Sequence, residues 1–185
     1  MDRLSNISIN MSLLLTYKYN HSLAPSDCKE SQVIEAINKA CKNWNKVLHQ
    51  EVKIIPAPNN LGYKPSITIG WINEQMMIER RRENDPVSPI PIAFCSARDR
   101  DILLCNEYKY VWDTTTLWSR ILLKLSVRID PVHILTHELG HAICNCGYHN
   151  KDADSIMSLY RGNGGKITQE DIAFMTKSAR EQKYQ

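Results

Sequence analysis

Hydrophobic and polar positions alternate over five short stretches of the chain, a pattern typical of β-strands with one buried face. Each stretch is rich in β-branched residues, leucine or aromatic residues, and polar or proline-containing segments separate them. The predicted strands are residues 13–19, 52–55, 66–72, 92–95 and 101–105. The alternation is clearest in SITIGWI at residues 66–72, and the last two strands lie on either side of a charged turn.

Hydrophobic residues recur every three or four positions in three longer segments, which predicts amphipathic helices. The first helix ends at about His49, and its apolar stripe is Val33, Ile34, Ile37, Cys41, Trp44, Val47 and Leu48. Asp27 and Glu30 precede this stripe at the spacing of a capping box. The second helix follows Asp130-Pro131, an N-cap residue and a proline at the first helical position. The third helix begins at Thr168, which also suits an N-cap.

The order of these elements, strand, helix, strands, helix and helix, predicts an α+β protein. The 185 residues suffice for one domain with its own hydrophobic core, and no repeat or linker divides the chain. We therefore expect a single domain over residues 1–185, with residues 1–12 as a flexible N-terminal tail. Residues 73–91 are polar and proline-rich, which predicts a long surface loop, and residues 117–125 are weakly helical.

The composition, with 43% hydrophobic and 23% charged residues, is that of an ordinary globular protein. The net charge is only +3, and the basic run at residues 80–82 is flanked by acidic residues, so no nucleic-acid partner is expected. No apolar run approaches the roughly 20 residues of a membrane span, and the N-terminus lacks the pattern of a secretory signal. We expect a monomer that is intracellular or leaves the cell by a non-standard route, without a membrane partner.

Six cysteines, at positions 28, 41, 95, 105, 144 and 146, are too sparse for a disulfide scaffold. They can pair, lie buried or bind metal, and the sequence does not choose among these roles. Cys41 falls on the apolar stripe of the first helix, where a free cysteine acts as a small hydrophobic residue.

The second helix contains the sequence HELGH, in which His137 and His141 are four residues apart. Residues at this spacing project from the same face of a helix, so both imidazoles can reach one Zn²⁺ ion. Glu138 is offset by one position and can reach a water molecule beside the metal, where a carboxylate acts as general base. The alternative is a pair of surface histidines. The neighbouring Gly140, which weakens a helix by roughly 1 kcal/mol relative to alanine, favours a site that needs close approach.

A catalytic zinc ion takes three protein ligands and leaves one position open. His149 is the favoured third ligand, because a chain that turns back after the helix can bring it beneath the metal. Cys144 and Cys146 are alternatives, since thiolates bind zinc strongly, and a second thiolate would close the site and make it structural. A carboxylate from Asp152 or Asp154 is a third option.

Downstream of HELGHAI, Ser155-Ile156-Met157 has the form S-x-M, and together these motifs resemble those of the metzincin zinc metalloproteases, specifically the matrixin branch. The resemblance covers nearly the whole chain. LLLTYKY resembles the first strand of that family, VIEAINKACKNWNKV its first helix and SITIGWI its third strand. IAFCSARDRDILLCNE resembles its substrate-side edge strand and the strand after it, and KITQEDIAFM resembles its closing helix.

This resemblance implies a twisted, mostly parallel five-stranded sheet with three helices and a Met-turn at Met157, whose side chain would form an apolar floor beneath the metal. It implies a zinc endopeptidase in which His137, His141 and His149 hold one zinc ion. Glu138 would be the general base and acid of peptide hydrolysis.

The resemblance also implies where a substrate binds. An extended peptide would pair with the edge strand at Ala93, Phe94 and Cys95, as in other cases of strand addition to a sheet. Tyr160 lies in the segment between Met157 and Thr168 that would shape the S1′ pocket. The peptide preference itself cannot be predicted from the sequence.

The chain departs from the family pattern between the second and third ligands. The family has glycine three residues after the second histidine and the third ligand three residues later, whereas this chain has Cys144 at the first position and His149 eight residues after His141. The departure amounts to a two-residue insertion. It leaves open an alternative function, an inactive metzincin-like binding or structural protein in which CNCGYH forms a closed zinc site or a disulfide loop.

The sequence gives less support for the other metal ions and the additional segments known in the family. No histidine occurs between residues 71 and 131, so the second, structural zinc of the family is not expected. Calcium could find oxygen ligands at Asp99, Asp101, Asn106 and Glu107, although surface carboxylates are common without an ion. We expect no inhibitory prodomain before the catalytic domain and no further domain after it.

Overall fold

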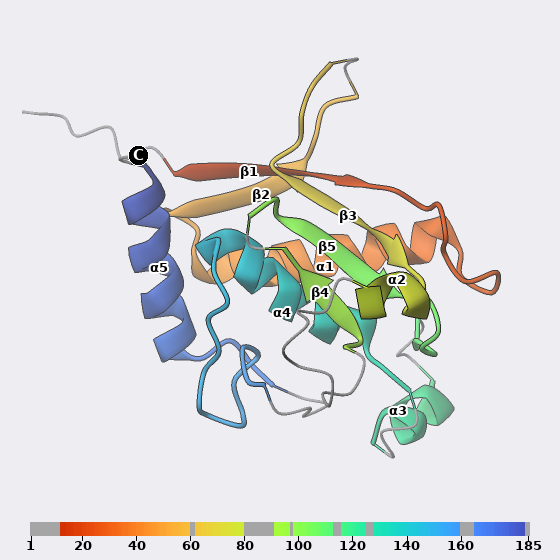
Figure 1. The fold of residues 1–185 in the computed structure, drawn as a ribbon. Helices are drawn as coiled ribbons and strands as arrows, with labels where there is room; N and C mark the ends of the chain where they lie inside the picture. Colours follow the sequence, from red (N-terminus) through yellow and green to blue (C-terminus); the bar gives the residue numbers. More distant parts are fainter. Residues whose placement is uncertain are drawn as a thin grey trace, which may run out of the picture.

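The computed structural model describes residues 12–59, 62–79, 91–96, 98–112, 116–124, 128–159 and 165–183, and the predicted tail therefore lies almost entirely outside the described residues. Five strands and five helices occur in the described part of the chain (Figure 1). The strands are β1 (Leu13–Tyr19), β2 (Val52–Pro56), β3 (Ile67–Ile72), β4 (Ala93–Cys95) and β5 (Asp101–Cys105). The helices are α1 (Glu30–Val47), α2 (Glu74–Glu79), α3 (Leu117–Lys124), α4 (Pro131–Cys144) and α5 (Gln169–Lys183). The predicted α+β class is confirmed.

All five strands belong to one mixed sheet with the order β2-β1-β3-β5-β4. β1 pairs in parallel with β2 and β3, and β3 pairs in parallel with β5. β4 is antiparallel to β5, with Phe94 opposite Leu103, and it forms one edge of the sheet. The mostly parallel five-stranded sheet is therefore present, and its antiparallel edge strand is the one that was expected to pair with a peptide.

Helices α1 and α4 pack against each other and lie beneath the sheet, and α5 stands beside β1 and α4 (Figure 1). The predicted apolar stripe of α1 is largely buried, including Ile37 and Cys41, although Ile34 lies at its margin and is 38% exposed. Trp44 is fully buried and its indole N–H donates to the carbonyl of Thr136 in α4, at 2.7 Å. This bond satisfies two polar groups that would be costly to bury unpaired. It also fixes the position of α4, the helix that carries HELGH.

The start of α1 differs from the prediction. The helix begins at Glu30, and Asp27 does not cap it. The backbone N–H of Lys29 donates instead to Oε1 of Gln32, at 3.1 Å. The residues before Lys29 form a turn in which the N–H of Cys28 bonds a carbonyl three residues earlier. This turn separates Asp27 from the helix.

The loop predicted over residues 73–91 is wrong for residues 74–79, which form α2. The side chain of Asn73 accepts a hydrogen bond from the N–H of Met76, at 2.8 Å, and so caps the helix start. Met77 is buried in a small cluster with Ile72 and Cys105. A cap and one buried side chain thus stabilise a helix of six residues, which is too short to show a periodicity in the sequence.

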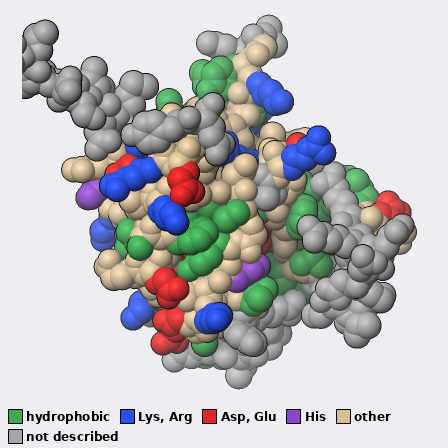
Figure 2. All heavy atoms as spheres, turned by 60° about the vertical axis from the view of Figure 1, so that its left-hand side comes forward, with side chains coloured by type: hydrophobic (Ala, Val, Ile, Leu, Met, Phe, Trp, Pro, Cys, Tyr) green, Lys and Arg blue, Asp and Glu red, His purple; other side chains and the backbone are tan. Residues whose placement is uncertain are grey.

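In the described residues, none of the helices combines the length and the apolar character that crossing a bilayer requires. On the face shown in Figure 2, Lys and Arg side chains are interspersed with Asp and Glu side chains around a group of hydrophobic ones. That face therefore carries no extended patch of only positive or only negative charge.

A buried carboxylate joins α5 to the strand layer. Glu51, at the start of β2, accepts hydrogen bonds from Arg180 at 2.6 Å and from Lys183 at 2.9 Å. Glu51 is only 8% exposed, and these two bonds hold the pKa of its carboxyl group below the usual value.

We expect Glu51→Gln to lower the free energy of unfolding by about 1–2 kcal/mol at neutral pH, because charge-assisted hydrogen bonds are lost. The loss is no larger because Arg180 is exposed and its bond contributes little. The pKa of Glu51 is lower in the folded than in the unfolded state. The advantage of the wild type is therefore present above the unfolded pKa of about 4.3 and lost as the pH falls through the folded value. Urea unfolding of both proteins, from neutral pH down to about pH 3.5, measures how the difference between their free energies of unfolding changes with pH. Glu35→Gln, which breaks an exposed pair with Lys39, is the control. A deficit of Glu51→Gln that does not shrink on acidification would contradict the ion-pair origin.

Candidate metal centre

The HELGH segment lies on α4, and both ends of this helix are fixed by side chains. Asp130 accepts hydrogen bonds from two backbone N–H groups of the first turn, and Pro131 is the first helical residue, as predicted. At the other end, the hydroxyl of Ser178 in α5 donates to the carbonyl of Cys144, at 3.0 Å. The amide of Gln182 donates to the carbonyl of Ile143, at 2.8 Å. These bonds satisfy helix-end groups that have no partner within the helix.

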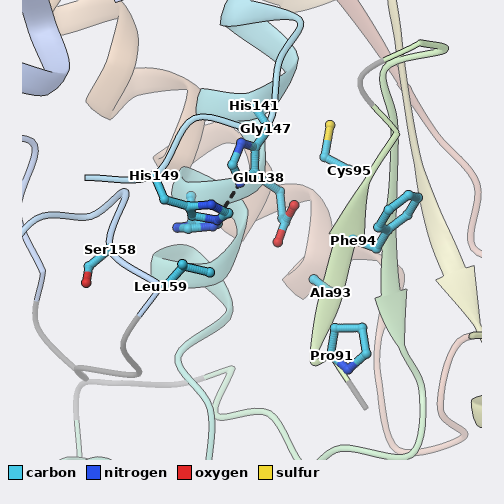
Figure 3. Close-up of a pocket in the computed structure, with 11 residues that line it drawn as sticks. Pro91, Ala93, Phe94, Cys95, Glu138, His141, Gly147, His149, Ser158 and Leu159 are labelled. Atoms are coloured by element: carbon cyan, nitrogen blue, oxygen red, sulfur yellow. Dashed lines mark hydrogen bonds between the residues drawn. The ribbon is translucent and has the colours of Figure 1, made fainter. Parts of the chain in front are cut away.

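Three imidazoles converge beside α4 (Figure 3). The ring centroids of His137 and His141 are 4.7 Å apart, and that of His149 lies 5.4 Å from the first and 4.8 Å from the second. One ligand nitrogen from each residue lies within 4.8 Å of the others. The two-residue insertion after His141 therefore still delivers the third histidine. Within the described ranges, this is the only group of three or more His, Cys, Asp or Glu side chains that could hold an ion.

Backbone carbonyls determine which nitrogen of each helical histidine is free. Nδ1 of His137 lies 2.7 Å from the carbonyl oxygen of Ile156, and Nδ1 of His141 lies 3.1 Å from that of Cys146. A carbonyl only accepts hydrogen bonds, so each Nδ1 carries the proton and each Nε2 presents a lone pair. The two Nε2 atoms face each other at 3.1 Å. Two lone pairs at this distance favour a cation between them.

Burial keeps the three imidazoles neutral. It lowers the pKa of His137 to about 4 and that of His141 to about 3. The pKa of His149 is also lowered by burial. A metal ligand must be the neutral imidazole, so at neutral pH all three side chains are in the form that binds a metal.

His149 is placed by a network around the carboxylate of Asp171 in α5. Its neighbour Asn150 bonds the carbonyl of Met157 through its own backbone N–H, at 2.9 Å, and donates a side-chain bond to Asp171, at 2.8 Å. The hydroxyl of Ser155 lies 2.8 and 2.9 Å from the two oxygens of the same carboxylate, and it accepts from the N–H of Met157. Asp171 is completely buried, which makes these bonds strong. It ties the segment of His149 to that of Met157.

The side chain of Met157 packs against α4 where Gly140 leaves room. A Cβ atom added at Gly140 would lie 2.3 Å from the sulfur of Met157 and 3.1 Å from the ring of Trp44. Met157 and Trp44 are both fully buried. The glycine inside HELGH therefore permits a close contact between α4 and the predicted Met-turn.

Glu138 lies beside the histidines, and its carboxylate points into the space between α4 and β4 (Figure 3). The cleft there has a volume of about 390 Å³, with the three histidines and Glu138 on one side and Ala93, Phe94 and Cys95 on the other. Glu138 is 7% exposed, and burial raises its pKa to about 8. A cation held by the histidines would act in the opposite direction, because a nearby positive charge favours the carboxylate form.

Cys144 and Cys146 are joined as a disulfide, with their Cα atoms 5.2 Å apart. A thiolate is the strong zinc ligand, so this pairing removes both cysteines from the set of candidate ligands. Asp152 and Asp154 are exposed and lie outside the three-histidine group; the carboxylate of Asp152 instead accepts from the N–H of Asp154, at 2.9 Å. Of the third ligands considered from the sequence, the structure brings only His149 to the other two.

The sequence also suggested Tyr160 for substrate binding and a set of oxygen ligands for calcium. Tyr160 lies outside the described residues. Asp99, Asp101 and Glu107, considered for calcium, do not gather into a group that could hold an ion. Asp101 bonds the hydroxyl of Thr68 instead.

The sequence did not identify the groups that orient the ligands. The carbonyl groups of Ile156 and Cys146 belong to the backbone, and no residue type signals their use. Asp171 lies three residues after Thr168, the predicted N-cap, and the two residues exchange backbone-to-side-chain bonds at 2.9 and 3.2 Å. Its bonds to Ser155 and Asn150 depend on how α5 packs.

No known protein-family model matches this sequence, and none of the curated proteins is similar to it. The fold and the geometry of the cleft therefore carry the functional argument. Together they define an α+β protein with a three-histidine group that could hold a metal ion.

We expect His149→Ala to weaken zinc binding by more than about 100-fold, since loss of a ligand should exceed the 10–100-fold effect of its outer-shell partners. Competition with a chromophoric chelator measures the affinity. His49→Ala, which changes an exposed histidine outside the group, should bind zinc as the wild type does. Equal affinities of His149→Ala and the wild type would exclude His149 as a ligand.

We expect Gly140→Ala to destabilise the protein, although alanine is the better helix former by about 1 kcal/mol. The added methyl must displace Met157 or Trp44, and such overpacking costs typically about 1–3 kcal/mol. Gly147→Ala is the matched control, because no atom lies within 4 Å of a Cβ atom at that position. Chemical unfolding of the wild type and the two variants measures the free energy of unfolding of each protein. A gain in stability for Gly140→Ala would show that the contact is loose.

Proposed function

We propose that the protein is a zinc-dependent endopeptidase of the metzincin type. The proposal rests on one observation above all: three imidazole ligands and one carboxylate share a cleft with an edge strand of the sheet. Each of these groups has a defined part in peptide hydrolysis, and the following paragraphs take them in turn.

The donor set fits zinc. Imidazole nitrogen is a preferred zinc ligand, and three protein ligands with one open position are typical of catalytic rather than structural sites. Two nitrogens bound to one tetrahedral zinc at about 2.05 Å lie roughly 3.3 Å apart, close to the 3.1 Å between the Nε2 atoms of His137 and His141. The carbonyls on their Nδ1 atoms would keep both rings in this orientation.

When bound, zinc supplies a Lewis acid that polarises the scissile carbonyl and lowers the pKa of the attacking water. Glu138 would take the proton from this water and pass it to the amine that leaves. Its position next to His137 on the same helix, with the carboxylate turned towards β4, suits this role. The apolar surroundings that raise its pKa also favour its acid form, which is needed for the second proton transfer.

The edge strand β4 offers a backbone for an extended peptide. The carbonyl of Ile92 and the N–H of Ser96 bond to β5, each at 2.9 Å. Bonding groups alternate along an antiparallel pair, so the N–H and carbonyl groups of Ala93 and Cys95 point to the outer edge. Both residues line the cleft that contains Glu138. A peptide paired with them would place its backbone beside the carboxylate.

The alternative is an inactive protein that uses the same fold for binding or structure, with CNCGYH as a closed zinc site or a disulfide loop. The Cys144–Cys146 disulfide agrees with the second of these two forms. A structural site needs a fourth protein ligand. In the described part of the chain the group has three members, and the two nearby cysteines are paired with each other. These observations argue against the closed zinc site. The endopeptidase is favoured over the disulfide-loop form because the three histidines and Glu138 line a cleft beside an edge strand.

We expect the zinc-loaded wild type to cleave members of a fluorogenic peptide library and Glu138→Gln to cleave them about 10²–10⁴-fold more slowly, the range that proton transfer contributes. Zinc affinity and thermal stability should be retained in Glu138→Gln, because the change removes a proton carrier and no ligand. Glu35→Gln, an exposed substitution on α1, is the control. No cleavage by the zinc-loaded wild type, or equal cleavage by Glu138→Gln, would overturn the proposal.

A further inference from the structure

The three-residue segment Cys144, Asn145 and Cys146, called here the cysteine strap, closes the C-terminal end of α4 over His141. Asn145 has a left-handed backbone, with φ of 53° and ψ of 39°, which reverses the chain direction. The N–H groups of Asn145 and Cys146 both point back to the carbonyl of His141, the latter at 3.4 Å. A disulfide joins the two ends of the strap.

The strap supplies the carbonyl that orients a metal ligand. As described above, Nδ1 of His141 bonds the carbonyl of Cys146 at 3.1 Å, and Nε2 of the same ring faces His137. A shift of this carbonyl would free the ring to rotate or to change its protonated nitrogen. Such outer-shell partners typically contribute 10–100-fold to metal affinity.

The disulfide adds a covalent link to the hydrogen bonds that hold the strap. A left-handed conformation is unfavourable for a residue other than glycine, and Asn145 tolerates it better than most. The next residue, Gly147, has no neighbouring atom within 4 Å of its Cβ position. Cys144 is buried with its carbonyl bound by Ser178, whereas Cys146 is half-buried. The disulfide thus joins the half-buried end of the strap to the buried end of α4.

The short ring argues for a local rather than a global role. A disulfide stabilises the folded state chiefly by restricting the unfolded chain, and this effect grows with the length of the loop it closes. The Cys144–Cys146 bond has a sequence separation of 2 and restricts the unfolded chain little. Its main effect falls on the position of the Cys146 carbonyl.

We propose that the Cys144–Cys146 disulfide positions His141 for metal binding, so that the affinity of the three-histidine site depends on the redox state of the strap. A dithiol reductant breaks the Sγ–Sγ bond, gives two electrons and two protons to form two thiols, and becomes a disulfide itself. The Cys146 carbonyl then loses the covalent restraint on its position, and the orientation of His141 is lost for part of the time. This inference rests on the metal site of the proposed function and is independent of peptide cleavage.

The test compares the zinc affinity of the full chain in both redox states. The oxidised protein is prepared in air, and thiol titration should find two fewer thiols than the six cysteines would give. The reduced protein is made with dithiothreitol, which is removed under argon before competition with a chromophoric chelator. Reduction should weaken zinc binding about 10–100-fold, and reoxidation should restore it.

The double variant Cys144→Ser, Cys146→Ser removes the bond without a reductant. It should bind zinc as weakly as the reduced wild type and should not respond to dithiothreitol, while its thermal midpoint stays near that of the wild type. Because the redox experiment uses the wild-type chain, it shows whether the disulfide affects zinc affinity even if the variant folds poorly. Cys28→Ser, which changes a buried free cysteine far from the strap in sequence, controls for loss of a thiol.

Each other outcome contradicts the inference in a distinguishable way. Equal zinc affinity before and after reduction would show that the three-histidine site binds zinc and that the disulfide does not affect this binding. Tighter binding after reduction, with a thiolate-to-metal charge-transfer band when Co²⁺ replaces zinc, would show that the freed cysteines act as ligands. Six free thiols in the air-prepared protein would show that the bond does not form. Zinc binding in neither state would overturn the metal site itself.

Discussion

The site depends on two imidazole nitrogens, from the buried His141 and the half-buried His137, that face each other at 3.1 Å with their lone pairs free. Each ring is held in this state by a backbone carbonyl on its other nitrogen, and burial keeps both rings neutral. Without a positive charge between them, this arrangement has no favourable interaction to offset the desolvation of both groups. It is therefore best understood as a site built for a cation, and it fixes the requirements on the rest of the fold.

The fold meets these requirements through contacts far from the metal centre. Trp44 in α1 holds α4 by a hydrogen bond to the Thr136 carbonyl, one residue before His137. Asp171 in α5 holds together the chain segments that contain His149 and Met157. Met157 in turn fills the space that Gly140 leaves on α4. The two helices that flank α4 thus position the ligands, and the sheet places the edge strand opposite them.

The fold and the three-histidine group could be predicted because their signals are local. Alternation in residues 66–72, the stripe around Trp44 and the Asp130-Pro131 cap each depend on a few neighbouring residues, and all three predictions are confirmed. The missed features depend on packing or on backbone groups. α2 is too short for a periodicity, and a turn separates Asp27 from the start of α1. The Cys144–Cys146 disulfide was one of the alternatives that the sequence left open, and the structure selects it. The role of Asp171 became visible only when α5 was placed against the site.

The most direct test of a catalytic zinc centre is a crystal structure of the zinc-loaded protein with anomalous data collected at the zinc edge. The account predicts one strong anomalous peak about 2.0–2.1 Å from Nε2 of His137, His141 and His149. The fourth position should be open to the cleft that holds Glu138. A peak with four protein ligands would contradict a catalytic centre, and the absence of a peak at the three histidines would contradict the metal site altogether.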